Sequence, residues 1–376
     1  MSSVPIRVVS VVGARPQFVK IAPVSRAFAA SRLPIEDLIV HTGQHYDDAM
    51  SKVFFDELGI PKPAVNLGIG SGLHGAQTGK MLESIEAFLL ERRPDVVVVY
   101  GDTNSTLAGA LAAAKLHVPV LHVEAGLRSF NRRMPEELNR VATDHLSTLL
   151  LAPTAAAVRN LENEGLANRT LRIGDVMYDA VLHNSAIARE RSRFLVSQGL
   201  ERGQYSVATV HRAENTTPHE LEVLLTELNV AAAEFGPVVF PIHPRTAASI
   251  ASALPGWAAS PSLRLVPPVG YLDMLALVDG ARFVLTDSGG LQKEAFFLDK
   301  PCCTLRNETE WVETVELGAN RIVGSDGAGL RQALREFGAR DGIAPASPGS
   351  GPAPFGDGDA AGKLLEALLD LVRGRR

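Results

Sequence analysis

Short β-branched runs alternate with longer amphipathic helical patterns along most of the chain, and this alternation predicts parallel α/β units. The run Val96–Tyr100 is apolar on both faces, as expected for a central parallel strand that helices cover on either side. In the first half we predict strands at Ile6–Val12, Leu38–His41, Val96–Tyr100, Val120–Val123, Leu149–Ala152 and Leu171–Ile173. The helices predicted beside them are Pro16–Ala30, His45–Leu58, Gly75–Arg92, Thr103–Leu116, Pro135–Ser147 and Ala155–Glu164.

The same alternation restarts in the second half of the 376-residue chain, a length that suits more than one domain. The amphipathic stretch Asp175–Leu200 would cross from the first domain to the second. The strands predicted there are Tyr205–Val210, Val238–Ile242, Leu263–Val266, Phe283–Thr286, Cys302–Leu305 and Arg321–Val323. Two sets of strands predict two Rossmann-like, doubly wound domains rather than one eight-stranded barrel.

A final amphipathic helix is predicted at Ala361–Val372, after a Pro-, Gly- and Asp-rich surface loop at Pro345–Asp359. Because its apolar stripe needs a docking surface, we expect this helix to return to the first domain. The predicted domains are therefore residues 1–174 with 358–376, and residues 175–357.

Composition limits the classes of protein that this chain can belong to. Hydrophobic residues make up 46% and charged residues 21%, as in globular proteins with apolar cores. The net charge of −5 disfavours a general nucleic-acid binder. No apolar run is long enough for a membrane span or signal peptide, and adjacent Cys302 and Cys303 suggest buried thiols in a reducing compartment. We therefore expect a cytoplasmic protein without nucleic-acid or membrane partners.

Ligands of doubly wound sheets bind beyond the carboxyl ends of the strands, so the residues after each predicted strand are candidates for chemistry. After the first strand, Gly13–Lys20 lacks the GxGxxG fingerprint, and no Walker A loop occurs in the chain. Nicotinamide and P-loop chemistry are therefore disfavoured. Arg15 could bind a phosphate together with helix amides, or could be an ordinary surface residue.

Acidic side chains follow the next two central strands of the first half. Asp102 comes two residues after one strand and Glu124 directly after the other, so both would face the same rim of the sheet. Helix capping by Asp102 or Thr103 is a structural alternative for the first position. A salt bridge to Arg128 at the edge of the core is the alternative for Glu124.

A third acidic candidate begins the helix that follows. Glu136 and Arg140 are four residues apart and share a helix face, whereas Glu137 points elsewhere. A glutamate beside an arginine at a cleft could be a positioned acid or base. Spacing alone favours a simple ion pair between the two side chains.

Histidines end two successive strands of the second half. His211 and His243 each have an arginine close by in the sequence, which favours an anion site over two purely structural histidines. The sequence contains neither an HExxH motif nor a Cys/His cluster, so it predicts no metal site. His41 and His45 are spaced as a pair, but the glycine between them indicates a loop and disfavours zinc.

The segment Leu285–Glu294 gives the sharpest local signal, because a strand runs into a Gly-Gly turn and a helix begins at once. The glycines let the backbone approach a ligand closely, and the free amides of a helix N-terminus bind phosphate. Glu294 could accept hydrogen bonds from ribose hydroxyls. A plain helix cap by Asp287 or Ser288 is the alternative.

These segments carry a resemblance to a known family over Gly13–Gly324, in the motifs GARPQFVK, TGQH, GDTNSTLAGA, HVEAGLRSFNRRMPEELNR, HRAEN, TDSGGLQKEA and TEWVE. On these motifs the chain resembles the bacterial and archaeal non-hydrolysing UDP-N-acetylglucosamine 2-epimerases. The resemblance implies an α/β fold of the GT-B type, with two Rossmann-like domains and a deep cleft between them. It also implies a homodimer, no cofactor, and a role in cell-surface polysaccharide biosynthesis.

The resemblance further implies that matching positions bind a UDP-sugar. The diphosphate would be held by Arg15, His211, His243, Ser288, Gly289 and Gly290. Glu294 would bind the ribose, and uracil would lie against the loop that ends at Met274. The residues implied around the sugar are Asp102, Glu124 and Glu136, with Lys20 and Arg140 as supporting cations.

The implied reaction removes the hydrogen on sugar carbon 2 and UDP from carbon 1 by anti elimination, which gives a 2-acetamidoglucal intermediate. UDP then adds back with carbon 2 inverted, so that UDP-GlcNAc and UDP-ManNAc interconvert. Such chemistry needs a base, an acid for the opposite face, and cations for the departing diphosphate. We hypothesise that Asp102 and either Glu124 or Glu136 move the proton, while His211 assists on the phosphate side.

Two departures from the common family pattern bear on the substrate. The GARPQF form resembles the subgroup that acts on UDP-2,3-diacetamido-2,3-dideoxyglucuronate, which is the alternative substrate. A candidate second UDP-sugar site would use Gln44, His45 and Gln77, as in the allosteric relatives. Ala76 stands where those relatives have an arginine, which disfavours activation by a second substrate molecule.

Two further functions are compatible with parts of the sequence. A GT-B glycosyltransferase would bind a similar donor but would also need an acceptor groove, whereas a silent UDP-sugar-binding regulator would show no turnover. The dense acids of the first domain favour proton chemistry on the sugar itself. The extra cations Arg132 and Arg133 could meet a uronate carboxylate, although a solvated approach to the helix explains them as well.

Overall fold

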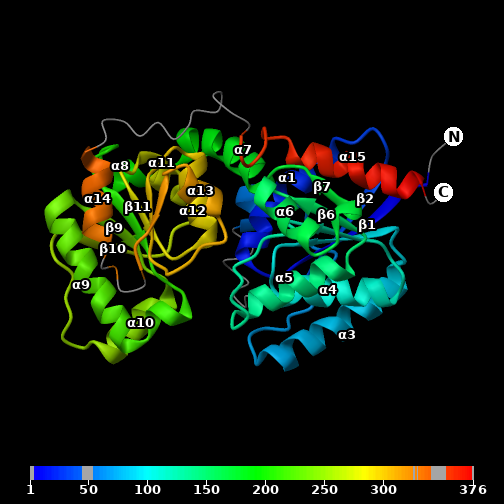
Figure 1. Cartoon of the computed structure of the whole chain (residues 1–376), viewed down its shortest axis with the longest axis horizontal. Helices are drawn as coiled ribbons and strands as arrows, with labels where there is room; N and C mark the ends of the chain where they lie inside the picture. The colour runs from blue at the N-terminus through cyan, green and yellow to red at the C-terminus, as the bar shows by residue number, and fades with distance from the viewer. Residues whose placement is uncertain (1–3, 45–53, 325–326, 328, 340–352, 375–376) are drawn as a thin grey trace. The chain divides into compact units, whose positions relative to one another are not determined.

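A computed structural model describes residues 4–44, 54–324, 327, 329–339 and 353–374 of the chain. The chain divides into two compact units (Figure 1). Unit 1 comprises Met1–Leu182 and Ala353–Arg376, and unit 2 comprises His183–Pro352. Each unit is built on its own parallel sheet, so each is described by itself.

Unit 1 contains a seven-stranded parallel sheet in the order β3-β2-β1-β4-β5-β6-β7. Its strands are β1 (Ile6–Val12), β2 (Ile35–His41), β3 (Val65–Asn66), β4 (Val96–Tyr100), β5 (Val120–Val123), β6 (Leu149–Ala152) and β7 (Thr170–Arg172). Its α-helices are α1 (Arg15–Ala29), α3 (His74–Arg92), α4 (Asn104–Lys115), α5 (Pro135–Leu146), α6 (Ala155–Asn163) and α15 (Ala360–Arg373), and α7 (Val176–Arg191) begins here. A 3₁₀ turn lies at Ala167–Arg169.

Unit 2 contains a six-stranded parallel sheet in the order β10-β9-β8-β11-β12-β13. Its strands are β8 (Ser206–Thr209), β9 (Val238–Pro241), β10 (Leu263–Val266), β11 (Val284–Thr286), β12 (Cys302–Thr304) and β13 (Asn320–Ile322). Its α-helices are α8 (Phe194–Ser197), α9 (Pro218–Phe235), α10 (Pro244–Ala253), α11 (Tyr271–Gly280), α12 (Gly289–Phe297), α13 (Val312–Glu316) and α14 (Leu330–Ala339). A 3₁₀ turn lies at Ala213–Thr216.

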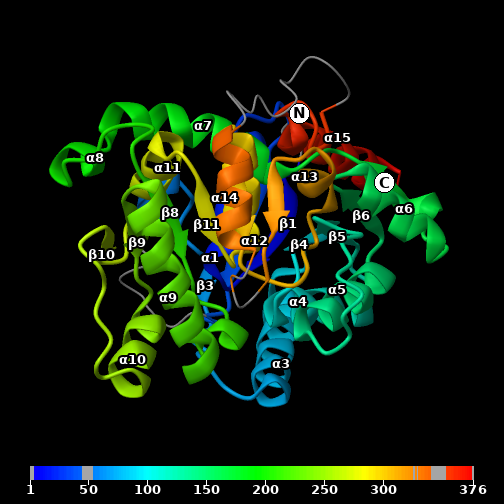
Figure 2. The same cartoon turned by 60° about the vertical axis from the view of Figure 1, so that its left-hand side comes forward.

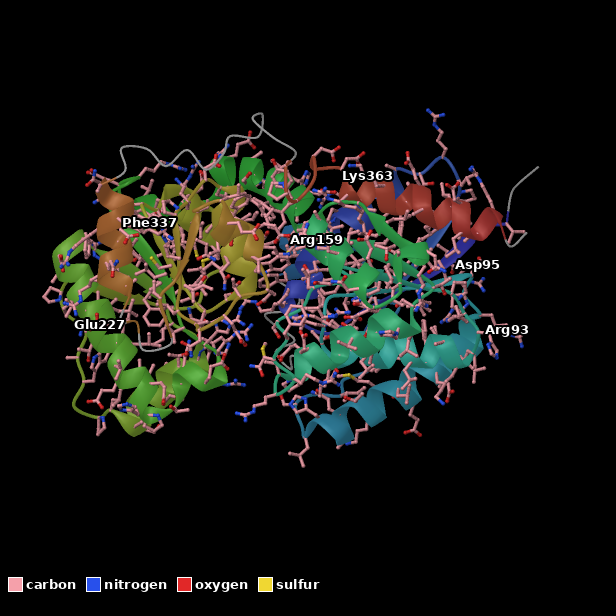
Figure 3. The ribbon with its side chains drawn as sticks, in the orientation of Figure 1. Arg93, Asp95, Arg159, Glu227, Phe337 and Lys363 are labelled. Carbon is pink, nitrogen blue, oxygen red and sulfur yellow. The ribbon has the colours of Figure 1, made fainter. Side chains whose placement is uncertain are left out.

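Apolar side chains from helices and strands form a separate core in each unit. In unit 1, Met81 and Ile85 of α3 pack with Val97 of β4, while α1 contacts α15. In unit 2, α9 and α14 cover the sheet (Figure 2). Phe337, which is labelled on α14 in Figure 3, stacks on Phe283. Both cores are therefore of the helix-covered parallel type that the apolar strands predicted.

The predicted α/β fold with two doubly wound sheets is confirmed, and β1, β4, β5, β6 and β10 have the predicted bounds. The two-residue strand β3 was not predicted, because it is too short to show the apolar run or the apolar–polar alternation that predicts a strand. Residues 45–53 of the predicted helix His45–Leu58, and much of the predicted loop Pro345–Asp359, lie outside the described residues. The interdomain cleft stays a prediction.

The returning helix α15 is fixed to unit 1 through the start of α7. The carboxylate of Asp179 accepts hydrogen bonds from the backbone N–H groups of Ala360 and Ala361. Just before them, the carbonyl of Phe355 accepts a hydrogen bond from the backbone N–H of Asp175. The boundary between the two compact units falls inside α7, between Leu182 and His183. The predicted domain boundaries at 174/175 and 357/358 remain a proposal.

Cys302 and Cys303 are free thiols buried on β12, as predicted. Burial raises the pKa of Cys302 to about 12, so this thiol stays protonated and behaves as an apolar side chain. Among the helices that the structure describes, none is long and apolar enough to cross a membrane.

Candidate active site

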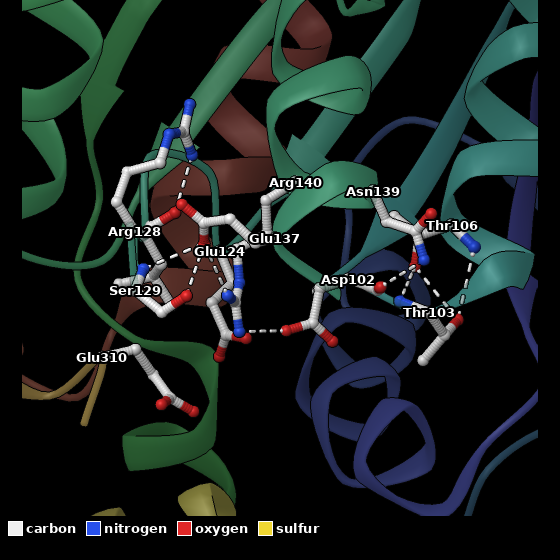
Figure 4. A network of polar contacts seen from close by, with 12 residues as sticks. Asp102, Thr103, Thr106, Glu124, Arg128, Ser129, Glu137, Asn139, Arg140 and Glu310 are labelled. Carbon is white, nitrogen blue, oxygen red and sulfur yellow. Dashed lines mark hydrogen bonds and ion pairs between the residues drawn. The ribbon is translucent and has the colours of Figure 1, made fainter. Parts of the chain in front are cut away.

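The rim of unit 1 is formed where β4 and β5 end and where α5 begins. Asp102 follows β4, and a carboxylate oxygen of Asp102 lies 2.5 Å from Nη2 of Arg140 (Figure 4). The side chain of Asp102 keeps 25% of its surface exposed, whereas that of Arg140 keeps 4%. A buried cation therefore holds a carboxylate that a ligand can still reach.

The ion pair within α5 differs from the predicted one. Glu137 is buried and binds Arg140 at 3.0 Å, whereas the sequence placed Glu136 on that face and turned Glu137 away. The carboxylate of Glu137 also accepts hydrogen bonds from the backbone N–H groups of Ser129 and Phe130. The prediction was wrong because the preceding loop folds back over Glu137, which helix spacing alone does not register. Glu136 is half-buried in the same first turn.

Glu124 follows β5 and forms a buried ion pair with Lys20 of α1, with 2.6 Å between Oε1 and Nζ. Glu124 has a φ of +72°, in the left-handed region. This backbone conformation costs free energy in residues other than glycine, and residues that adopt it are common at functional sites. The alternative partner, Arg128, instead binds Asp144 and Glu164. The salt-bridge alternative for Glu124 was therefore wrong in its partner.

Gln17 is a rim residue that the sequence reasoning missed. Its side-chain oxygen accepts hydrogen bonds from the backbone N–H groups of Gly13 and Ala14. Its amide nitrogen donates to the carbonyl of Tyr100 and to the hydroxyl of Thr106. This buried amide joins the start of α1 to the end of β4. The signal was the polar residue inside GARPQF, since a buried amide needs both donors and acceptors around it.

Two turns of unit 1 settle alternatives that the sequence left open. Thr103 caps α4 by accepting a hydrogen bond from the backbone N–H of Thr106, so helix capping does not explain Asp102. Arg15 begins α1 half-buried, with its guanidinium carbon 4.4 Å from the centre of the Phe54 ring. Phosphate binding by Arg15 remains a prediction.

The candidate second-site residues gather at the start of α4. The side-chain oxygen of Gln44 accepts a hydrogen bond from the hydroxyl of Ser105 at 2.7 Å. Gln77 of α3 accepts one from the side-chain amide of Asn104 at 2.8 Å. His45 lies outside the described residues. Ligand binding at these glutamines stays a prediction.

The rim of unit 2 is formed where β8, β9 and β11 end and where α12 begins, and Asp287 is at its centre. One oxygen of this fully buried carboxylate accepts hydrogen bonds from the backbone N–H groups of His211 and Arg212, at 2.8 Å and 2.9 Å. The same oxygen lies 3.1 Å from the amide nitrogen of Asn215. Ser288, not Asp287, caps α12. Asp287 instead fastens the loop that follows β8.

The structure brings the two predicted histidines together. The rings of His211 and His243 are 6.2 Å apart between their centres. His211 Nδ1 lies 3.2 Å from the second oxygen of Asp287. His243 Nδ1 accepts a hydrogen bond from the backbone N–H of Arg245, which leaves its proton on Nε2 as a donor. The Nε2–H donor of His243 is suited to an anion, although its ligand stays a prediction.

The remaining residues predicted to bind the nucleotide lie on α11 and α12. Gly289 and Gly290 open α12, and a Cβ at Gly289 would lie 2.5 Å from Oε1 of Glu310, so a larger residue there would force the Glu310 side chain to shift. Glu294 lies one turn further along α12 and is buried. Met274 is half-buried on α11 against the core of unit 2.

Within the described part of the chain, no group of three or more His, Cys, Asp or Glu side chains is arranged to hold a metal ion. His41 has a structural environment instead. Its Nδ1 accepts a hydrogen bond from the backbone N–H of Gly43, and its ring stacks on Phe18 with 5.2 Å between centres. His41 therefore supports the loop after β2.

Comparison with known proteins gives matches along almost the whole chain. A family profile described as UDP-N-acetylglucosamine 2-epimerase matches residues 29–369. A UDP-N-acetylglucosamine 2-epimerase homolog from Methanococcus maripaludis is 48% identical, and the match covers 97% of this chain and 100% of the relative. A UDP-2,3-diacetamido-2,3-dideoxy-D-glucuronate 2-epimerase from Pseudomonas aeruginosa is 45% identical, again over 97% and 100% of the two chains.

A solved structure extends the likeness to the fold. The UDP-GlcNAc 2-epimerase of Methanocaldococcus jannaschii, in complex with UDP-GlcNAc and UDP, superposes with a TM-score of 0.87 at 41% identity. The match covers 97% of this chain and 99% of that one. Sequence and architecture therefore agree over both units.

Proposed function

This chain belongs to the UDP-N-acetylglucosamine 2-epimerase family and has its GT-B fold, and from this premise we propose that it interconverts UDP-N-acetylglucosamine and UDP-N-acetylmannosamine. Family membership makes it an isomerase of nucleotide sugars rather than a glycosyltransferase. The observation that carries the proposal is the pairing of Glu124 and Asp102 with buried cations at one rim.

The proposed reaction begins when a carboxylate takes the proton from carbon 2 of the sugar. The electrons of that C–H bond form a double bond between carbons 1 and 2, and the bond from carbon 1 to UDP breaks with its electron pair on UDP. In the second half, an oxygen of UDP adds to carbon 1 and a proton is delivered to the opposite face of carbon 2. The sequence is redox-neutral, so it requires no nicotinamide.

The rim of unit 1 supports the proton transfers of this reaction. Lys20 pairs with Glu124 and Arg140 pairs with Asp102, so that buried cations position both carboxylates at the rim. We propose that Asp102 and either Glu124 or Glu136 act on opposite faces of carbon 2. Two groups are needed because one carboxylate cannot reach both faces of the sugar.

The rim of unit 2 supports diphosphate binding. His243 offers Nε2–H, and the Gly289-Gly290 turn offers the free amides at the start of α12. We propose that these groups hold the diphosphate with His211, Ser288 and Arg15, and that Glu294 binds the ribose. Stabilising the charge on departing UDP lowers the barrier to elimination. Met274 would then lie against uracil.

A second candidate substrate is UDP-2,3-diacetamido-2,3-dideoxyglucuronate, which the Pseudomonas relative is named for. Arg132 and Arg133 are exposed in the loop before α5, and Glu137 fixes the start of that loop. Exposed cations close to Glu136 would suit the extra carboxylate of a uronate. This observation keeps the uronate as a rival to UDP-N-acetylglucosamine.

The experiment that tests the proposal is proton NMR of the enzyme in deuterated water with each UDP-sugar in turn. We expect loss of the carbon 2 proton signal and appearance of the 2-epimer with UDP-N-acetylglucosamine. The same outcome only with the diacetamidouronate would transfer the assignment to the second candidate. Absence of exchange with both, in protein that binds UDP, would support a silent UDP-sugar-binding regulator.

We also propose that the enzyme is cytoplasmic and works as a homodimer, as the family resemblance implies. The adjacent buried thiols on β12 fit a reducing compartment. Light scattering of the purified full chain tests the dimer, and a mass equal to one chain of 40.1 kDa would exclude it.

A further inference from the structure

A buried histidine beneath the rim of unit 1 has acceptors on both sides of its ring. Nδ1 of His122 lies 2.6 Å from an oxygen of Asp144, and Nε2 lies 2.7 Å from the carbonyl oxygen of Gly101. Carbonyl and carboxylate oxygens only accept hydrogen bonds, so both ring nitrogens must donate. The ring of His122 is shielded completely from solvent, so these two oxygens are the groups that hold it.

Asp144 of α5 receives further hydrogen bonds on its other oxygen. This oxygen lies 3.1 Å from the backbone nitrogen of Gly126 and 2.7 Å from Nη2 of Arg128. Burial alone would raise the pKa of Asp144, but the charges and hydrogen bonds of His122 and Arg128 lower it below its usual value. Asp144 is thus a buried carboxylate that His122, Arg128 and the backbone of Gly126 hold together.

These contacts end at the two turns that carry the predicted catalytic carboxylates. Gly101 directly precedes Asp102, and Gly126 is two residues beyond Glu124. Asp144 reaches the first turn through His122 and the second through its own hydrogen bond to Gly126. One carboxylate therefore sets the position of both turns.

The two turns meet at the Lys20–Glu124 ion pair, and the turn of Glu124 has a strained backbone. Gly101 has a φ of +64°, and a Cβ there would lie 3.0 Å from Nζ of Lys20 and 3.5 Å from Oε1 of Glu124. The Gly101 turn therefore passes close against the Lys20–Glu124 ion pair. Glu124 itself is in the left-handed region, which persists only where neighbouring contacts over-determine it.

We propose that His122, Asp144 and Arg128 form a buried positioning set that fixes the spacing of Asp102 and Glu124 for proton transfer at carbon 2. This inference rests on the proposed epimerase function. The three side chains are at most 5% exposed, so they act through the turns and not by touching the sugar. Displacing a reacting group by about 1 Å can cost roughly 10²-fold in rate.

The test compares Asp144→Asn and His122→Gln with the unmodified full chain. We expect kcat for epimerisation to fall about 10²-fold in both, with KM and the Kd for UDP unchanged. We also expect a larger share of each turnover to end as free UDP and unsaturated sugar, because a displaced acid fails to complete the second half. The double variant should cost no more than the worse single variant, since the two residues act as one unit.

The matched control is Asp37→Asn, which alters a carboxylate of the same unit that binds Ser10 and Ser25 away from the rim. We expect Asp37→Asn to lower Tm and leave kcat and product partition unchanged. The proposal is overturned if folded Asp144→Asn and His122→Gln enzymes keep full kcat, or if their loss appears in KM alone. A rise in released intermediate is the result that a merely structural role does not produce.

A measurement that needs no turnover separates this inference from the proposed function. Nitrogen-15 NMR of histidine-labelled protein should show protons on both ring nitrogens of His122 at neutral pH. A neutral His122 ring would overturn the positioning set even in an active enzyme. If the wild-type chain epimerises neither UDP-sugar while His122 is doubly protonated, the proposed function fails. A crystal structure of Asp144→Asn then decides the inference, because an unchanged distance between Asp102 and Glu124 would overturn it.

Discussion

Cations hold the predicted catalytic carboxylates at the rim of unit 1, whereas amide groups hold the central carboxylate at the rim of unit 2. Lys20 pairs with Glu124 and Arg140 with Asp102, each within 2.6 Å. Asp287 accepts instead from two backbone N–H groups and from Asn215. Paired charges suit proton transfer, and fixed backbone suits anion recognition. The comparison indicates that the rim of unit 1 positions charged side chains, whereas the rim of unit 2 positions backbone N–H groups.

Asp102→Asn should have the largest effect, because it removes one of the two charged carboxylates at the rim of unit 1. The variant keeps the shape of the side chain but removes its charge and its ability to take a proton. We expect deuterium exchange at carbon 2 to fall roughly 10³-fold. Calorimetry with UDP should show unchanged affinity, because the groups proposed to bind UDP lie mainly at the other rim. Undiminished exchange would remove Asp102 from the proposed chemistry.

Asp287→Asn tests the rim of unit 2 in the opposite direction. The variant keeps one acceptor oxygen but loses the carboxylate charge, which weakens the hydrogen bonds from the backbone N–H groups of His211 and Arg212, so the loop after β8 should shift. We expect the Kd for UDP to rise about tenfold or more. Asp279→Asn, which breaks only exposed pairs to Arg189 and Arg202, is the control and should bind UDP normally. Equal affinity in both variants would contradict the role of Asp287.

Gln17→Met tests an uncharged side chain at the rim of unit 1, where the carboxylates are held by cations. The variant keeps the length of the side chain and leaves the backbone N–H groups of Gly13 and Ala14 buried without their acceptor. We expect the free energy of unfolding in urea to fall by about 1–3 kcal/mol. Exposed Gln198→Met is the control for the exchange itself. A loss no larger than that of the control would show that Gln17 is replaceable.

Asp179 is a carboxylate of unit 1 that accepts hydrogen bonds from backbone N–H groups, as Asp287 does in unit 2. Its replacement should have the smallest effect on stability. Burial raises the pKa of Asp179 to about 6, against the lowering effect of the N–H groups of Ala361 and Ala360. Because the folded value exceeds the unfolded value near ~3.9, its contribution to stability is full below pH ~4 and is lost as the pH rises through 6.

Lowering the pH from 7 to 5 should therefore raise the stability of the wild type by about 1 kcal/mol relative to Asp179→Asn. Urea unfolding of both proteins at the two pH values measures this difference. Since all other groups are shared, the subtraction isolates Asp179. Parallel pH dependence in the two proteins would show that Asp179 has an ordinary pKa in the folded state.

The fold could be predicted from sequence because each buried parallel strand is a short apolar run that ends in polar residues. Reading those ends also found Asp102, Glu124 and both histidines of unit 2. Asp144 was missed because it lies near the end of a helix, and its partners are distant in sequence. The orientation of Glu137 was predicted wrongly, because helix spacing carries no information about the preceding loop, which folds back onto this side chain. Local patterns therefore predict which elements form, but not which buried partners they choose.

The return of α15 to unit 1 has a consequence for the order in which a growing chain can fold. The carboxylate of Asp179 cannot accept its hydrogen bonds from the N–H groups of Ala360 and Ala361 until they have been synthesised, 181 residues or more after it. At about 5–20 residues per second, that delay is roughly 10–40 s. During it, unit 2 is synthesised whole while the face of α1 that later contacts α15 stays uncovered. Unit 2 can thus complete its core first, although unit 1 begins the chain.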